Sequence, residues 1–156
     1  MTLTHKVIWI TGASSGIGAL IARFAAEQGA IPILTARSES KLREVSATLP
    51  GKHGMMILDV TDEQSVRTVA QRIVDEYGRI DVLVNNAGYG LFESVEDMQL
   101  SDYEGIMNVN YFGVVRCTKA ALPHMRAAGS GQILTVASMA GKFATAKSAG
   151  YAASKH

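Results

Sequence analysis

The sequence has a single cysteine, Cys117, so it cannot form an internal disulfide. This scarcity is typical of reducing compartments, and residues 1–6 are too short and polar for a signal peptide. We therefore expect a cytoplasmic protein. Long hydrophobic runs are also missing: the first apolar run, Val7–Ile10, has the length of a strand, whereas a membrane span needs about 20 residues. We expect no membrane association.

The chain lacks a charge excess of either sign, with 15 basic and 14 acidic residues. Without a basic footprint, we expect no nucleic-acid partner. The 4 histidines show no spacing typical of metal ligands, so we expect no metal site. Proline is scarce and 47% of the residues are hydrophobic, which favours a folded core over disorder.

Short apolar runs alternate with segments of helical periodicity, which predicts a single α/β domain over residues 1–156. The runs lack polar alternation, so we expect a doubly wound parallel sheet (Rossmann-like) with helices on both faces. The first helix places Ile17, Leu20, Ile21, Phe24 and Ala25 on one face. Strands are predicted at Val7–Ile10, Ile31–Thr35, Met55–Leu58, Ile80–Val84 and Ile133–Ala137. Helices are predicted at about Ile17–Gln28, Ser40–Leu49, from Thr61 or Asp62 onward, and at Ser101–Met125. We expect the last of these to bend or end near Pro123.

A glycine-rich turn, Thr11 to Gly18, lies between the first strand and the first helix. Such a turn lets the backbone approach a pyrophosphate, which the helix N-terminus stabilises with free N–H groups and its dipole. A tight connection that simply needs glycine is the alternative. The flanking strand and helix favour phosphate binding.

The second strand ends at Arg37, and no carboxylate follows until Glu39. In dinucleotide-binding folds an acid near this position binds the ribose hydroxyls of NAD, whereas an arginine accommodates the 2′-phosphate of NADP. We therefore predict a preference for NADP(H) over NAD(H). Ser38 and Lys41 are weaker candidates for the same phosphate, and a solvated surface arginine is the alternative.

Four further signatures follow in order. Asn85-Asn86-Ala87-Gly88 comes after the fourth strand, Asn110 lies within the long helix, and Ser138 follows the fifth strand. Tyr151 and Lys155 are four residues apart, which puts both on one face of a helix. An ammonium beside a phenol favours its phenolate form. Each signature alone could be a turn, a satisfied core amide or chance.

Together, over about Lys6–Lys155, these motifs resemble the short-chain dehydrogenase/reductase family, in its NADP-preferring type. In that family Asp59 and Val60, at the end of the third strand, would contact the adenine; a helix-capping carboxylate is the alternative for Asp59. The resemblance implies that the cofactor contacts come from Gly12, Ser14, Ser15, Gly16, Ile17, Gly18, Arg37, Asp59, Val60, Asn86, Ala87, Gly88, Tyr151 and Lys155.

The resemblance also implies an NADP(H)-dependent oxidoreductase that transfers hydride between the nicotinamide and a small-molecule carbonyl or alcohol. Tyr151 would be the general acid/base and Ser138 would orient the substrate oxygen. Lys155 would lower the pKa of the tyrosine and hold the nicotinamide ribose. Asn110 would anchor a water of the proton relay. The family further implies a homodimer or homotetramer.

The sequence departs from the family at its end, with five predicted strands where the family typically has seven. Because isolated helices of two turns are unstable, we expect Ala149–His156 to be irregular or ordered only by a neighbouring molecule. We also expect the fifth strand to be an open apolar edge. The alternative function for the 156-residue chain is therefore a nucleotide-binding or structural piece without turnover.

Overall fold

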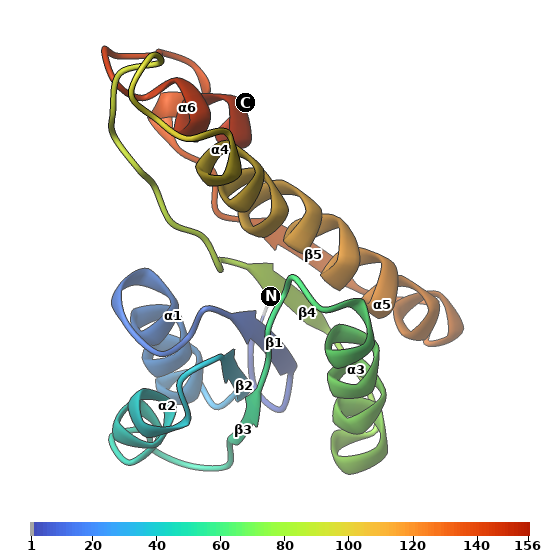
Figure 1. Cartoon of the computed structure of the whole chain (residues 1–156). Coiled ribbons are helices and arrows are strands. Elements are labelled where there is room, and N and C mark those ends of the chain that lie inside the picture. Colours follow the sequence, from blue (N-terminus) through green and yellow to red (C-terminus); the bar gives the residue numbers. More distant parts are fainter. Residues whose placement is uncertain (1) are drawn as a thin grey trace.

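The structure, a computed structural model, describes residues 2–156 and contains a parallel sheet of five strands in the order β3-β2-β1-β4-β5. The predicted doubly wound parallel sheet is confirmed (Figure 1). The strands are β1 Val7–Thr11, β2 Ile31–Ala36, β3 Gly54–Ile57, β4 Val82–Asn85 and β5 Gln132–Thr135. The helices are α1 Gly16–Glu27, α2 Glu39–Ser46, α3 Glu63–Tyr77, α4 Leu100–Met107, a π-helical segment η1 Asn108–Phe112, α5 Gly113–Ala127, a 3₁₀ turn η2 Met139–Gly141 and α6 Ala149–Lys155.

The core has two layers because successive residues of a strand point to opposite faces of the sheet. Trp9 of β1 faces α3 and α5, and Ile10 faces α1 and α2. The indole N–H of the fully buried Trp9 donates to Thr35 Oγ1 at 3.1 Å, so its one polar group is satisfied. Helices on both faces bury strands β1, β2 and β4, as the apolar runs predicted, whereas β5 is exposed.

The apolar stripe expected on α1 coincides with its buried face only in part, at the buried Ala25 and the half-buried Ile21. Ile17, Leu20 and Phe24 are 58–66% exposed. The helix packs on the sheet through small residues instead, because only small side chains let helix and sheet approach closely. The residues of α1 that are buried are Gly18, Ala22, Ala25 and Ala26.

The long helix is observed as α4, η1 and α5 in direct succession. It does not end at Pro123, since α5 continues to Ala127. In η1 the N–H of Gly113 donates to the carbonyl of Asn108, five residues back. This turn therefore holds one residue more than a turn of α-helix. Elsewhere the predicted boundaries differ by a few residues: α2 begins at Glu39 and ends at Ser46.

The expectation that Ala149–His156 is irregular is wrong. Residues Ala149–Lys155 form α6, which packs on α4: a Cβ on Gly150 would lie 2.8 Å from the Tyr103 ring. Asn110 donates to Ser154 Oγ at 2.9 Å inside the protein. Tertiary contacts therefore stabilise a helix that would be too short alone. By contrast, within residues 2–156 β5 is an edge strand of the sheet, as expected, and all four of its residues are exposed.

Asp81 connects the starts of β1 and β4. Its carboxylate accepts from the Val7 N–H at 2.9 Å and from Lys6 Nζ at 3.0 Å. Arg79 Nη2 forms an ion pair with Asp81 Oδ1 at 2.6 Å. Burial alone would raise the pKa of Asp81, but the Val7 and Lys6 hydrogen bonds and the two positive charges outweigh it, so the pKa lies below its ordinary value.

We predict that Asp81→Asn lowers the free energy of unfolding by about 2 kcal/mol at neutral pH. The substitution removes the buried carboxylate, so Lys6, Arg79 and the Val7 N–H lose a charged acceptor. A depressed folded-state pKa stabilises the protein above the unfolded-state value of about 3.8, and this contribution disappears as the pH falls through the folded-state pKa. Denaturant titrations should therefore show the two proteins converging below about pH 4. The exposed pair of Glu39 and Arg43 gives the control: Glu39→Gln should change stability much less. An equal loss at low pH would contradict this account.

Candidate functional site

The turn after β1 is closed against the segment after β4. Gly12 has φ +66°, and a Cβ there would lie 2.8 Å from the Ala87 Cα. A Cβ on Gly18 would lie 2.5 Å from both Asn86 Nδ2 and the Gly12 carbonyl. Only glycine fits positions 12 and 18, so close backbone packing shapes this turn.

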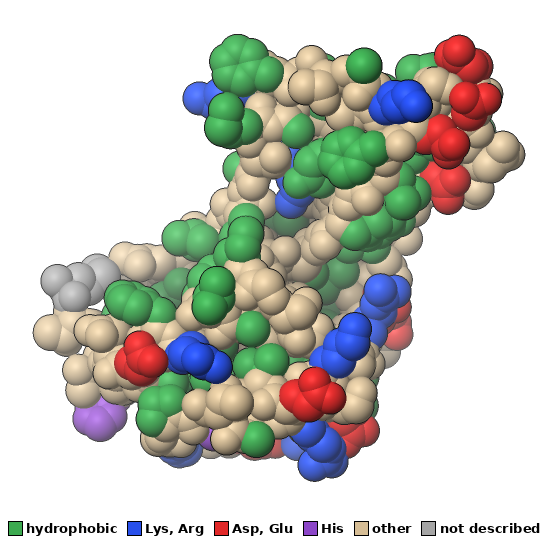
Figure 2. Space-filling view, turned by 90° about the vertical axis from the view of Figure 1, so that its left-hand side faces the viewer, with side chains coloured by type: hydrophobic (Ala, Val, Ile, Leu, Met, Phe, Trp, Pro, Cys, Tyr) green, Lys and Arg blue, Asp and Glu red, His purple; other side chains and the backbone are tan. Residues whose placement is uncertain are grey.

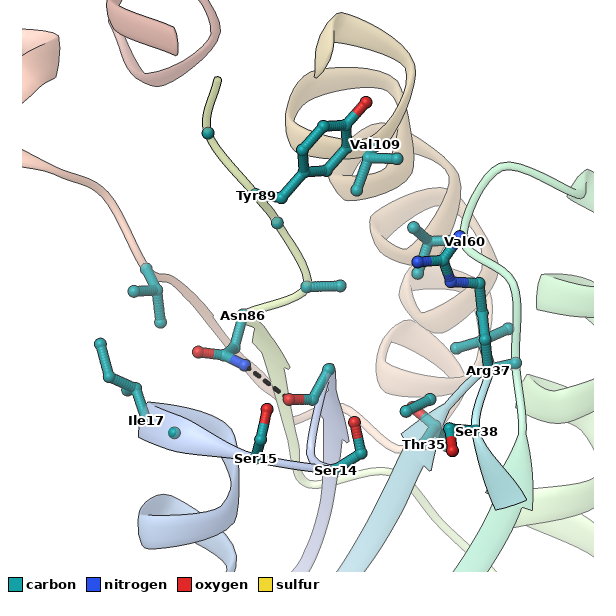
Figure 3. A pocket seen from close by; sticks show the side chains of 18 of the residues that line it. Ser14, Ser15, Ile17, Thr35, Arg37, Ser38, Val60, Asn86, Tyr89 and Val109 are labelled. Atoms are coloured by element: carbon teal, nitrogen blue, oxygen red, sulfur yellow. Dashed lines mark hydrogen bonds between the residues drawn. The ribbon is translucent and has the colours of Figure 1, made fainter. Parts of the chain in front are cut away.

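Hydrogen bonds hold the two segments together. Asn86 Nδ2 donates to the carbonyls of Thr11 at 3.0 Å and Gly12 at 3.1 Å. Thr11 Oγ1 accepts from the N–H groups of Asn86 and Ala87, both at 3.0 Å. Figure 3 shows Asn86 facing the turn that carries Ser14 and Ser15. The Asn86 side chain thus satisfies backbone groups of the turn and fixes its shape.

A cleft of about 980 Å³ opens at the carboxyl ends of the strands, where open α/β sheets bind ligands. Every cofactor contact predicted from the sequence lines it except Gly18, which supports the turn from behind. Sequence reasoning missed several lining residues, although all but Val109 of the long helix adjoin predicted positions at or just after strand ends. Those residues are Thr35, Ala36, Leu58, Tyr89, Gly90, Val109, Val136 and Ala137.

Arg37 extends from the end of β2 toward Val60, across one wall of the cleft (Figure 3). Asp59 accepts from the Thr61 N–H at 2.9 Å and from Thr61 Oγ1 at 2.7 Å. Burial alone would raise the pKa of Asp59, but the Thr61 hydrogen bonds and the charges of Arg37 and Arg116 lower it overall. This end of the cleft therefore combines an ionised carboxylate with an exposed guanidinium.

Arg116 of α5 was missed by the sequence analysis. Its guanidinium donates to the Val60 carbonyl at 3.3 Å and to the Asn108 carbonyl and Oδ1 at 3.2 and 2.8 Å. It thereby connects a cleft wall to the π-helical segment. The one available signal was a basic residue on a helix between the apolar residues Val115 and Cys117.

Ser138, Tyr151 and Lys155 line the other end of the same cleft. Ser138 Oγ accepts from the Ala140 N–H at 3.2 Å, which leaves its own O–H able to donate. Lys155 Nζ donates to the Val136 carbonyl at 3.1 Å, and a Cβ on Gly88 would lie 3.3 Å from that nitrogen. The structure brings these three predicted residues together with the glycine turn.

Asn110 does not line the cleft but lies buried behind it. Its amide donates to the Tyr89 carbonyl at 2.8 Å and to Ser154 Oγ at 2.9 Å, and its Oδ1 accepts from the Tyr89 N–H at 3.0 Å. Ser154, which the sequence analysis did not single out, donates onward to the Tyr151 carbonyl at 2.8 Å. Asn110 therefore ties α6 to the loop after β4.

The cleft fits an elongated anionic dinucleotide. The glycine turn and the uncapped N-terminus of α1 suit its phosphates, and polar groups lie at both ends of the cleft. The family model described as short chain dehydrogenase matches residues 6–156. The chain belongs to the short-chain dehydrogenase family. This confirms the resemblance that the ordered motifs indicated.

Among curated relatives, the chain is 38% identical over 161 residues to the mouse dehydrogenase/reductase SDR family member 7, covering 99% of this chain and 48% of the relative. It is 41% identical over 150 residues to the 3-ketodihydrosphingosine reductase of Bacteroides thetaiotaomicron, covering 96% and 53%. The crystal structure of NAD+-bound xylitol dehydrogenase has a TM-score of 0.96 at 31% identity, covering 99% and 61%. The chain thus spans about half the length of these curated relatives.

Within residues 2–156, no helix is both long and apolar enough to cross a membrane. The same residues contain no group of three or more His, Cys, Asp or Glu side chains placed to hold a metal ion.

We predict that Gly18→Ala weakens NADPH binding by at least about tenfold, because the new methyl group would displace the Gly12 carbonyl and the Asn86 amide. Fluorescence titration with NADPH would measure the affinity. Gly51→Ala is the control: nothing lies within 4 Å of a Cβ at position 51, although this glycine, unlike Gly18, has a positive φ of 68°. It should cost some stability and leave affinity unchanged. Equal NADPH affinities in the two variants would show that the close packing at Gly18 is not needed for cofactor binding.

Proposed function

We propose that this protein is an NADP(H)-dependent oxidoreductase that interconverts a carbonyl compound and an alcohol, with Tyr151 as the general acid and base. The observation that carries the proposal is the assembly of Ser138, Tyr151 and Lys155 in one cleft with the glycine turn. The dehydrogenase family supports an oxidoreductase. It favours catalysis over the alternative of a nucleotide-binding piece without turnover.

The cleft fits a nicotinamide dinucleotide, with its pyrophosphate at the turn of Gly12 and Gly16 and its adenosine beside Asp59 and Val60. When bound, that cofactor would supply or accept the hydride. The NAD+-bound relative shows that family membership alone does not select NADP. The preference rests on Arg37, whose exposed guanidinium can form charge-assisted hydrogen bonds with a 2′-phosphate.

In the reductive direction, the Tyr151 hydroxyl donates its proton to the oxygen of the substrate carbonyl as the carbon receives hydride, which yields the alcohol. The Ser138 hydroxyl donates a hydrogen bond to the same oxygen and orients it. Lys155, which lines the same cleft, would hold the ribose hydroxyls of the nicotinamide nucleoside. In the oxidative direction the tyrosinate accepts the proton.

Asn110 supports this chemistry from behind the cleft. Both amide hydrogens are already donated, to Tyr89 and Ser154, so a relay water at this position would have to donate to an acceptor atom of Asn110. Through Ser154 the same side chain holds the helix that carries Tyr151 and Lys155. These hydrogen bonds support a positioning role, and the family resemblance adds the anchoring of a relay water.

Self-association as a homodimer or homotetramer is part of the proposal. Tyr111, Phe112 and Val115 are exposed on the long helix and supply an apolar surface for it. We also propose a cytoplasmic location and a small-molecule carbonyl or alcohol as the substrate. Of these, family membership supports only a small-molecule substrate.

We predict that Arg37→Ala in the complete protein weakens NADPH binding by roughly ten- to a hundredfold, since a charge-assisted contact contributes about 1.5–3 kcal/mol. Binding of NADH should change little because it lacks the phosphate. Arg43→Ala, which removes an exposed arginine paired with Glu39, is the control and should affect neither cofactor. Equal affinities of the unmodified protein for NADPH and NADH would already exclude the proposed preference.

We further predict that Tyr151→Phe lowers kcat to below about a hundredth of the unmodified value, given the usual contribution of general acid catalysis. NADPH affinity should remain nearly constant, because the hydroxyl acts on the substrate oxygen. Steady-state kinetics and cofactor titration measure the two effects separately. Tyr111→Phe removes a hydroxyl from an exposed ring and should leave kcat unchanged. Substantial turnover by the Tyr151 variant would overturn the assignment.

A further inference from the structure

The two ends of the cleft lie on different parts of the molecule. Figure 2 shows a hollow between the lower part, which carries α1 and α2, and the upper part, which carries α6. The long helix extends along both parts: in Figure 1 it runs from beside α6, through η1, to beside α3. Contacts with this helix therefore offer a physical connection between the adenosine end of the cleft and its catalytic end.

Arg116 of α5 binds the wide turn η1 at Asn108. Its guanidinium donates through Nη1 to the Asn108 carbonyl at 3.2 Å and through Nη2 to Asn108 Oδ1 at 2.8 Å. The same carbonyl accepts the N–H of Gly113, which is the hydrogen bond that widens the turn. A carbonyl oxygen has two lone pairs, so it can accept both donors. The arginine thus holds the backbone and the side chain of Asn108 together.

The same guanidinium holds the wall of the cleft at its adenosine end. Nη1 also donates to the Val60 carbonyl at 3.3 Å. The first residue of α5 packs on this wall, because a Cβ on Gly113 would lie 2.9 Å from Val60 Cγ2. Val60 is buried and lines the cleft, whereas Arg116 does not line it. Arg116 would therefore act on a bound adenosine through Val60.

The wide turn also leads to the catalytic end of the cleft. Val109 lines the cleft, and Asn110 is buried behind it. Asn110 donates to Ser154 Oγ of α6 at 2.9 Å, and Ser154 donates to the Tyr151 carbonyl at 2.8 Å. One residue separates Asn108 from Asn110, so a shift of the turn would displace the hydrogen bonds that hold α6.

We propose that Arg116 is a positioning residue that couples the two ends of the cleft. It fixes the Val60 wall and the wide turn to each other, so that an adenosine bound beside Val60 stabilises α6 and the position of Tyr151. This inference rests on the proposed function, which puts the adenosine at this wall. Lysine is no substitute, because its ammonium is a point donor on a flexible stem, whereas the planar guanidinium spans three acceptor atoms.

The test is amide hydrogen exchange in α6 of the complete protein, with and without a cofactor fragment that lacks the nicotinamide nucleoside. Adenosine 2′,5′-bisphosphate and ADP are the two fragments. Each is added at the same multiple of its Kd for every variant, so that stabilisation by binding alone is equal. In the unmodified protein we expect a bound fragment to slow exchange in α6 at least about fivefold, and in Arg116→Lys less than about twofold.

Two further variants sharpen the comparison. Arg126→Lys is the matched control: Arg126 is exposed near the end of the same helix, and the slowing of exchange should remain intact. Asn108→Ala keeps Arg116 and its charge but removes one acceptor, so it should reduce the slowing in part. Thermal midpoints show whether each variant folds, and Asn108→Ala decides the question if Arg116→Lys does not.

The outcomes separate this inference from the proposed function. If a bound fragment leaves exchange in α6 of the unmodified protein unchanged, the coupling is overturned and the proposed function stands. Equal slowing in Arg116→Lys and in the unmodified protein would overturn the role of Arg116. If neither fragment binds and NADPH does not bind either, the proposed function fails, and this inference fails with it.

Discussion

The contact between two backbones, at Gly12 and Ala87, determines the geometry of the site. The turn after β1 and the segment after β4 come so close that a single methyl group at position 12 or 18 would separate them. The Asn86 amide then binds the turn from the side, so the end of α1 faces the cleft. Because both segments begin on buried central strands, the sheet transmits its rigidity to the phosphate-binding end of the cleft.

The opposite end of the cleft depends on a polar side chain rather than on close backbone packing. Asn110 is buried, and three hydrogen bonds satisfy its side chain. Those bonds join the π-helical segment, the loop after β4 and α6, which are remote in sequence. Leaving any of these partners unpaired inside the protein would be costly, so the arrangement favours one position of Tyr151 over others.

The sheet, the glycine turn and most of the lining residues could be predicted because each follows from a local pattern. Apolar runs identify buried strands, and strand ends place their next residues at the cleft. Tertiary context decided the rest. Periodicity located α1 but only part of its buried face, since Ala22 and Ala26 pack closer to the sheet than Leu20 or Phe24 could. Propensity alone could not foresee α6, whose stability comes from Tyr103 and Asn110.

The extra residue in Asn108–Phe112 has a consequence for how the chain can vary in length. The wide turn takes up this residue locally, so loss of one residue here would close the turn to α-helical geometry and leave α5 in place on the sheet. Loss of a residue at the start of α5 would instead turn the rest of the helix by about 100°. Cys117, Ala121 and Met125 would then leave the core together, and Arg116 would swing away from the Val60 carbonyl. Sequence alignments should therefore place gaps in the loop of residues 88–97 or within Asn108–Phe112, and none between Gly113 and Met125.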